Sequence, residues 1–291
     1  MTENLRLDKE LNILIVGLGL MGGSYAKALT EQGYKVSAIT RSQQSIDYAL
    51  AKGLIARGST RAEPELIAEA ELIVFALYPN VFLRWIEENQ RYFAPGTVLT
   101  DVTGVKTGVV YNIQEMLRED VEFIASHPMA GRERYGVENS DPGIFRGANF
   151  IVTPTGKNSP QAVELCEALG NTLGFATVSR LSPEEHDDMI GFLSQLTHCI
   201  AVTLMTCNDA PNMENYTGDS FRDLTRIARI NDEMWSELFL LNKDALLKHM
   251  DAFEAEFMKL RGYLADGDRE SMREMMRCST ERRAHFDKKY C

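Results

Sequence analysis

The sequence predicts an α/β domain followed by an all-helical domain. As far as Arg180, short apolar runs alternate with helical patterns, which is typical of a parallel sheet with helices on both faces. The first apolar run is followed at once by a glycine-rich turn, and after Arg180 only helical patterns remain. We therefore expect two domains, residues 1–180 and 181–291.

The elements of the first domain can be placed in order along the chain. Apolar runs predict strands at 11–17, 35–40, 71–77, 97–102, 121–126, 149–154 and 175–179. Helical patterns between them predict helices at 24–33, 43–52, 64–69, 81–90, 105–117 and 159–170. Such an alternation brings the carboxyl ends of the strands to one edge, where ligands bind in open α/β sheets.

The second domain begins with a clear helix-start signal. Ser182 is the expected N-cap, Pro183 takes the first helical position and Glu185 completes a capping box. The pattern then predicts a mostly apolar helix to residue 207, a long helix over 231–264 and a polar helical tail over 268–289. A long helix with apolar residues on several sides often packs against a partner subunit, so we expect a homodimer; the same residues also suit an intramolecular core.

Composition excludes several classes of function. The net charge of -11 argues against binding to nucleic acid, and no run approaches 18 consecutive apolar residues, so we expect no membrane contact. The polar N-terminus is unlike a secretory signal, and five scattered cysteines without a CxxC pair suggest neither a zinc site nor disulfides. We expect a reduced, cytoplasmic protein that holds no metal. If its ligands are anions, the site must supply its own positive potential.

Residues 17–22 match the pattern G-x-G-x-x-G between a predicted strand and a predicted helix. Gly17 allows the tight turn, Gly19 lets a pyrophosphate approach the backbone, and Gly22 lets helix and strand pack closely. The main chain at Leu20 and Met21 then faces the phosphates at the helix N-terminus. In this context the pattern predicts a Rossmann-like dinucleotide-binding domain.

The end of the second strand indicates which dinucleotide binds. An NAD enzyme usually has an acid there, which binds the ribose 2′-hydroxyl, but this strand ends in Thr40, Arg41 and Ser42. Arginine can pair with a 2′-phosphate, so we expect NADP in preference to NAD. The alternative is that Arg41 is an ordinary solvated arginine. We also expect Asp101, at the end of the strand over 97–102, to contact the cofactor.

His127 is the candidate for proton transfer. It follows a predicted strand and precedes proline and glycine, which places it at the ligand-binding edge of the sheet. A neutral imidazole can accept a hydroxyl proton while hydride leaves the same carbon. His249 and His285 are expected on helix surfaces, and capping or packing explains His186 equally well.

The helical domain offers further polar candidates. Gln195 and His198 lie three residues apart on one face of an apolar helix, and buried polar groups there need partners. Those partners are each other, backbone groups or a ligand. Arg226 is a candidate for binding a carboxylate, although its spacing from Asp223 favours a surface ion pair.

Taken together, these segments resemble the prephenate and arogenate dehydrogenase family. The shared segments are GLGLMGGS, TDVTGVK, SHPMAG, SQLTH, FRDLTRIA and Met234-Trp235, in the family's order. The resemblance implies NAD(P)-dependent oxidative decarboxylation of prephenate to 4-hydroxyphenylpyruvate in tyrosine biosynthesis, or of arogenate to tyrosine.

The resemblance also implies roles for individual residues. His127 matches the catalytic histidine, which takes the hydroxyl proton, and Arg226 matches the arginine that binds the ring carboxylate. His198 matches a histidine that lines the substrate pocket, Trp235 a tryptophan beside the substrate's side chain, and Glu133 an acid near the pocket mouth.

Two departures from the family pattern affect the expected site. Gly104 stands where the family often has a serine that contacts the substrate or the catalytic histidine, and we hypothesise that the adjacent Thr103 supplies the hydroxyl as a second catalytic residue. Gln195, an expected substrate-binding residue, stands where some members have histidine.

Two other functions share features with this sequence. A β-hydroxyacid dehydrogenase would share the nucleotide domain but use a lysine on a glycine-rich helix, which this sequence lacks. A nucleotide-sensing module that has lost catalysis is favoured only by Gly104 and is opposed by His127 and Arg226.

Overall fold

The computed structural model describes residues 6–132 and 134–286 and divides into two compact units. The first unit runs to Lys243 and the second begins at Asp244. The domain boundary predicted at residue 180 therefore falls inside the first unit and stays a prediction. Each unit is described by itself.

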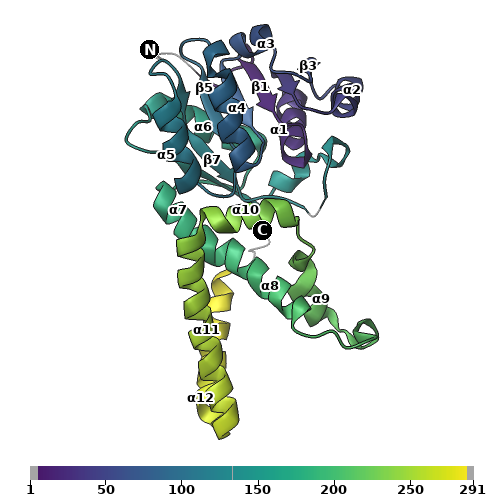
Figure 1. The fold of residues 1–291 in the computed structure, drawn as a ribbon, viewed down its shortest axis with the longest axis vertical. Helices are drawn as coiled ribbons and strands as arrows, with labels where there is room; N and C mark the ends of the chain where they lie inside the picture. The colour runs from purple at the N-terminus through teal and green to yellow at the C-terminus, as the bar shows by residue number, and fades with distance from the viewer. Residues whose placement is uncertain (1–5, 133, 287–291) are drawn as a thin grey trace. The chain divides into compact units, whose positions relative to one another are not determined.

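A six-stranded parallel sheet forms the centre of the first unit (Figure 1). Its strands are β1 (Asn12–Val16), β2 (Lys35–Ile39), β3 (Arg57–Ser59), β4 (Leu72–Phe75), β5 (Val98–Asp101) and β6 (Glu122–Phe123). Their order is β3-β2-β1-β4-β5-β6, so the direction of winding reverses between β1 and β4. This order confirms the Rossmann-like prediction, and the reversal marks where such sheets bind dinucleotides.

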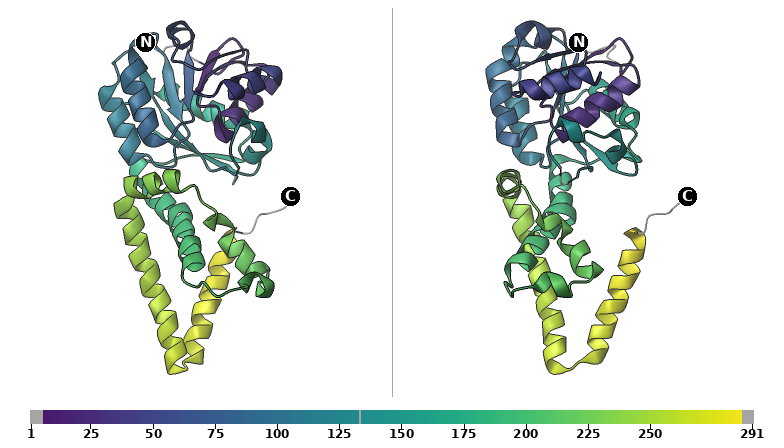
Figure 2. Two further views of the ribbon diagram at one scale, coloured as in Figure 1. Left: turned by 45° about the vertical axis from the view of Figure 1, so that its right-hand side comes forward. Right: turned by 90° about the vertical axis from the view of Figure 1, so that its right-hand side faces the viewer.

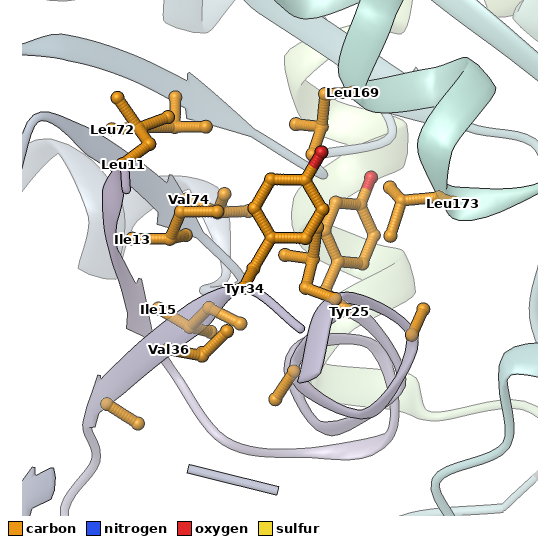
Figure 3. Packing of buried hydrophobic residues seen from close by; sticks show 14 of the residues in the cluster. Leu11, Ile13, Ile15, Tyr25, Tyr34, Val36, Leu72, Val74, Leu169 and Leu173 are labelled. Carbon is orange, nitrogen blue, oxygen red and sulfur yellow. The ribbon is translucent and has the colours of Figure 1, made fainter. Parts of the chain in front are cut away.

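Two hydrophobic cores lie on opposite faces of this sheet, because successive side chains of a strand point in opposite directions. Ile13 and Ile15 of β1 belong to one core, and Leu14 and Val16 belong to the other. Figure 3 shows the first core, where Tyr25 lies among Leu169 and Leu173. The covering helices are α1 (Leu20–Glu31), α2 (Gln43–Ala51), α3 (Pro64–Ala68), α4 (Pro79–Asn89), α5 (Thr107–Met116) and α6 (Pro160–Leu173).

A second, three-stranded sheet corrects the expectation of a single sheet. The strand predicted over 121–126 is divided at Ile124 into β6 and β7 (Ala125–Pro128). β7 pairs antiparallel with β8 (Asn149–Thr153), which pairs parallel with β9 (Thr177–Arg180). The division has a physical cause: the Ile124 amide still donates to the Leu99 carbonyl of β5, but the Ser126 amide donates to the side chain of Asp101, at 3.0 Å.

The apolar helix predicted after Ser182 is confirmed, with one irregular turn. It consists of α7 (Pro183–Ile190), a π-helical segment (Gly191–Leu196) and α8 (Thr197–Thr206), and the capping box of Ser182 and Glu185 is formed. By length and composition alone, Pro183–Thr206 is the one helix in the described part of the chain that could span a membrane. Core helices meet the same criteria.

The single helix predicted over 231–264 is wrong, because the chain breaks at Asn242. α9 (Asp219–Thr225) is followed by α10 (Asp232–Leu241), and α11 (Lys243–Asp266) starts after the break. Asn242 leaves helical geometry, and its buried side chain donates to the Asp187 carbonyl and to Gln195 Oε1, each at 2.8 Å. These tertiary bonds replace the regular helix at this residue.

The second unit is a helical hairpin (Figure 2). α11 is joined at Gly267, which has a φ of 66°, to α12 (Arg269–Arg283). α12 confirms the predicted helical tail within the described residues. Phe253 and Phe257 lie one turn apart on α11, and both are exposed within the single chain.

Candidate active site

The glycine-rich turn has the geometry that a pyrophosphate needs. Gly17 has a φ of 100°, and a side chain at Gly22 would collide with the Gly17 carbonyl oxygen. At Gly19, the N-cap of α1, no atom lies within 4 Å of where a side chain would begin. The first turn of α1, which includes Leu20 and Met21, therefore presents unpaired backbone N–H groups to open space. This donor set fits a dinucleotide phosphate.

The end of β2 offers one exposed cationic side chain. The Thr40 amide donates to the Ser59 carbonyl at 3.1 Å, which continues the sheet by one residue. The Ser42 hydroxyl accepts from the Ser45 amide at 3.1 Å and so caps α2. Arg41 lies between them with an exposed side chain, close to the switch point of the sheet.

A buried ion pair lies at the end of β5. Lys106 Nζ is 2.7 Å from Asp101 Oδ2, and both side chains are fully buried. Lys106 Nζ also donates to the Ser126 carbonyl at 2.6 Å, while Asp101 accepts from the amides of Thr103 and Ser126. Burial lowers the pKa of Lys106, and the Asp101 carboxylate opposes that shift. Asp101 thus holds protein groups in place, and its predicted contact with the cofactor stays a prediction.

Gly104, and not Thr103, faces His127. The Thr103 hydroxyl is buried and has Asp101 and the Val105 carbonyl as acceptors within hydrogen-bond distance. A side chain starting at Gly104 would lie 3.9 Å from His127 Nε2 and 3.5 Å from Leu238, which is ordinary contact distance. The catalytic role of Thr103 stays a hypothesis. The position beside His127 Nε2 is that of Gly104.

His127, His186 and Asp187 form a hydrogen-bonded relay. The sequence did not predict that His186 and Asp187 belong to the site. His127 Nδ1 lies 2.8 Å from Nε2 of His186, whose Nδ1 lies 2.8 Å from Asp187 Oδ1. Asp187 in turn accepts from the amides of Lys106 and Thr107 at the start of α5. The His186-Asp187 dipeptide follows a capping box, so in the sequence it reads as the first turn of a helix.

The surroundings of His127 and His186 favour the neutral form of both rings. Burial lowers the pKa of His127 well below its usual value, and the neighbouring His186 and Lys106 lower it further. Burial also lowers the pKa of His186, against the opposing effect of its hydrogen bond to Asp187. A neutral imidazole is the form that can accept a proton.

Gln195 is engaged with the protein. Its side chain is buried in the π-helical segment, where Nε2 donates to the Leu238 carbonyl at 3.1 Å and Oε1 accepts from Asn242 at 2.8 Å. π-Helical turns are frequent at functional sites. Here the turn connects α7 and α8 to α10, and the predicted contact of Gln195 with substrate stays a prediction.

His198 and Trp235 meet. Their ring centroids are 3.7 Å apart, and His198 Nδ1 donates to the Ser194 carbonyl at 2.8 Å. Trp235 and Leu238 both lie on α10, so one helix contributes to the surroundings of His198 and of Gly104 (Figure 1).

Arg226 and Glu133 are the two remaining substrate residues predicted from the sequence. Arg226 is exposed in a 3-10 turn (Arg226–Ala228) that packs against α8, the helix of His198. Glu133 lies outside the described residues.

Comparisons with known proteins agree along most of the chain. The family described as prephenate dehydrogenase, nucleotide-binding domain, matches residues 25–177, and prephenate dehydrogenase, dimerization domain, matches residues 182–278. The prephenate dehydrogenase of Bacillus subtilis is 32% identical over 272 residues, which cover 89% of this chain and 72% of the relative. The cyclohexadienyl dehydrogenase of Zymomonas mobilis is 29% identical over 88% of this chain and 90% of its own.

A solved structure extends the likeness to three dimensions. The prephenate dehydrogenase of A. aeolicus, in complex with hydroxyphenyl propionate and NAD+, superposes with a TM-score of 0.88 at 29% identity. The superposition covers 95% of this chain and 98% of that one.

The lowered pKa values of His127 and His186 predict a loss of stability in mild acid. Histidine in the unfolded chain takes up its proton near pH 6.5, whereas His127 and His186 stay neutral to lower pH in the folded chain. The unfolded state therefore binds more protons below pH 6.5. We expect the free energy of unfolding in urea to be about 1–3 kcal/mol lower at pH 5.5 than at pH 7.5.

The double variant His127→Asn/His186→Gln is the control for this measurement. It removes both buried imidazoles, so its stability should change much less over the same pH interval. An unchanged pH dependence in the double variant would contradict the assignment.

Proposed function

The chain belongs to the prephenate dehydrogenase family, and we propose that it oxidises prephenate to 4-hydroxyphenylpyruvate, with loss of carbon dioxide, in tyrosine biosynthesis. The observation that carries the proposal is the half-buried His127, whose pKa is lowered and whose Nε2 lies beside Gly104. Gly104 follows β5 and the dinucleotide turn follows β1, so both lie at the carboxyl ends of parallel strands of the six-stranded sheet. A cytoplasmic location is part of the proposal.

In this reaction His127 acts as the general base. Its Nε2 accepts the proton of the substrate's ring hydroxyl as the carbon–oxygen double bond forms. The bound nicotinamide supplies the acceptor for the hydride that leaves the same carbon. Departure of the ring carboxylate as carbon dioxide makes the ring aromatic, so the protein mainly has to position the substrate and remove one proton.

Binding of the substrate is assigned to charged and aromatic groups of the helical part. Prephenate is a dianion, and Arg226 is proposed to bind its ring carboxylate through a bidentate contact. His198 and Trp235, whose rings contact each other in a tilted arrangement, are proposed to border the substrate's side chain. Gln195 and Glu133 complete the proposed set. Arogenate, with an ammonium group in place of the keto group, is the alternative substrate.

The proposed reaction predicts a substrate-dependent rise in absorbance at 340 nm. We expect prephenate or arogenate to reduce the dinucleotide, and His127→Asn to lower kcat by about 10²- to 10⁴-fold, because the general base is lost. His285→Asn, which changes an exposed histidine, is the matched control and should leave the rate unchanged. Full activity of His127→Asn, or no reduction with either substrate while the dinucleotide still binds, would contradict the proposal.

NADP is the proposed cofactor, on the strength of Arg41 at the end of β2. A charged hydrogen bond from Arg41 to the 2′-phosphate predicts that Arg41→Ala lowers kcat/KM for NADP by about 10- to 100-fold and leaves that for NAD nearly unchanged. Arg91→Ala is the matched control, because Arg91 precedes β5 and lies toward the opposite edge of the sheet. An equal effect of Arg41→Ala on both dinucleotides would show that Arg41 does not select the cofactor.

A homodimer is proposed from the exposed apolar side chains of the helices. Within the single chain, Phe192 is 52% exposed, Leu240 72% and Phe257 59%. Large apolar side chains that stay exposed in the single chain are candidates for burial against a partner subunit. Phe257→Asp should therefore shift the protein from dimer to monomer in sedimentation, whereas Leu50→Asp on α2 should not. A wild-type protein that sediments as a monomer would contradict the proposal.

A further inference from the structure

His186 and Asp187 form a hydrogen-bonded relay with Nδ1 of His127. We infer that His186 and Asp187 are positioning residues, which fix the tautomer of His127 so that Nε2 offers a lone pair to the substrate hydroxyl. The inference rests on the proposed role of His127 as the base. Neither residue needs to touch substrate or cofactor for this role.

The carboxylate of Asp187 is held in one orientation. Its Oδ1 accepts from the Lys106 amide and Oδ2 accepts from the Thr107 amide, each at 2.8 Å, and the Thr107 hydroxyl donates to Oδ2 as well. These bonds to the start of α5 prevent the carboxylate from rotating. Burial opposes ionisation, but hydrogen bonds from His186 and Thr107 keep the pKa of Asp187 below its usual value. An ionised carboxylate only accepts hydrogen bonds.

This carboxylate determines the tautomer of His186. Its Nδ1 lies 2.8 Å from Asp187 Oδ1, so that nitrogen must carry the proton. A neutral imidazole has one donor and one acceptor nitrogen, which makes Nε2 of His186 an acceptor. The side chain of His186 is fully buried, so water cannot supply a competing partner.

The tautomer of His186 in turn determines which nitrogen of His127 carries the proton. Nδ1 of His127 lies 2.8 Å from Nε2 of His186, and with an acceptor on that side it must be the donor. Nε2 of His127 then bears the lone pair, and this nitrogen faces the space at Gly104. The opposite tautomer would place two lone pairs against each other at 2.8 Å.

The relay of His127, His186 and Asp187 can also accommodate the proton that His127 takes up. When Nε2 of His127 accepts the substrate proton, the ring becomes an imidazolium. Its Nδ1 proton can pass to Nε2 of His186, which leaves His127 neutral and places the imidazolium on His186, hydrogen-bonded to Asp187. One proton enters the relay and one positive charge results, next to a carboxylate.

Nitrogen NMR of the full-length protein tests the tautomer without any substrate. In ¹⁵N-histidine-labelled protein, saturated with NADP and with the His127 signals assigned by their loss in His127→Asn, we expect Nδ1 protonated and Nε2 unprotonated at pH 7.5. Asp187→Asn, which can turn its amide donor toward His186, should shift His127 toward the opposite tautomer. Finding Nε2 of His127 protonated in the wild type would overturn the inference, whatever the substrate proves to be.

Kinetics of a matched pair of variants at His186 form the second test, and they do not depend on Asp187→Asn folding. His186→Gln keeps an acceptor for His127 Nδ1, and His186→Leu removes it. We expect Leu to lower kcat about 10²- to 10³-fold and Gln about tenfold or less, with KM changed little in either, because a misplaced base slows the chemical step. Equal losses in both variants, or a loss confined to KM, would overturn the inference, and thermal unfolding shows that both variants are folded.

Discussion

The buried ion pair of Asp101 and Lys106 is the interaction on which the site depends. Both side chains are fully buried, and losing one partner of such a pair costs about 3–5 kcal/mol, because the other charge stays without compensation. The pair also holds Ser126, the residue before His127: Asp101 accepts from the Ser126 amide and Lys106 donates to the Ser126 carbonyl. Because these bonds fix both backbone groups of Ser126, the direction in which His127 leaves the chain is fixed as well.

A second buried acid, Asp187 of α7, binds the segment that follows Asp101. Residues 101–107 connect β5 to α5, and the amides of Lys106 and Thr107 at its end are bound by Asp187 of α7. One segment therefore places the histidine through Asp101 and its hydrogen-bond partner through Asp187. Asn242 extends this network by donating to the Asp187 carbonyl and to Gln195. The polar groups buried at this junction are thus bound to one another, as buried polar groups must be.

The features that the sequence predicts well are those with local causes. The glycine pattern at 17–22, the alternation of apolar runs and the capping box at Ser182 each depend on neighbouring residues, and the structure confirms them. The features it mispredicts depend on distant partners. The division at Ile124 needs the Asp101 side chain, and the helix break at Asn242 needs Asp187, 55 residues away in sequence. His186 was passed over for the same reason, because only the fold brings it to His127.

Burial of the histidine separates two tasks that conflict in a single side chain. A protein with a net charge of -11 that acts on a dianion needs cations, and a protonated histidine would attract the substrate. A protonated histidine cannot accept a proton, however, and burial lowers the pKa of His127 so that it stays a base. Lys106 cannot supply the field either, because Asp101 neutralises it at 2.7 Å. Groups outside this buried network must then attract the anionic ligands. Arg41 and Arg226, which are exposed, and the N-terminus of α1 are groups of this kind. In the proposed function, binding and proton transfer therefore belong to different residues, each in the dielectric surroundings that its own task requires.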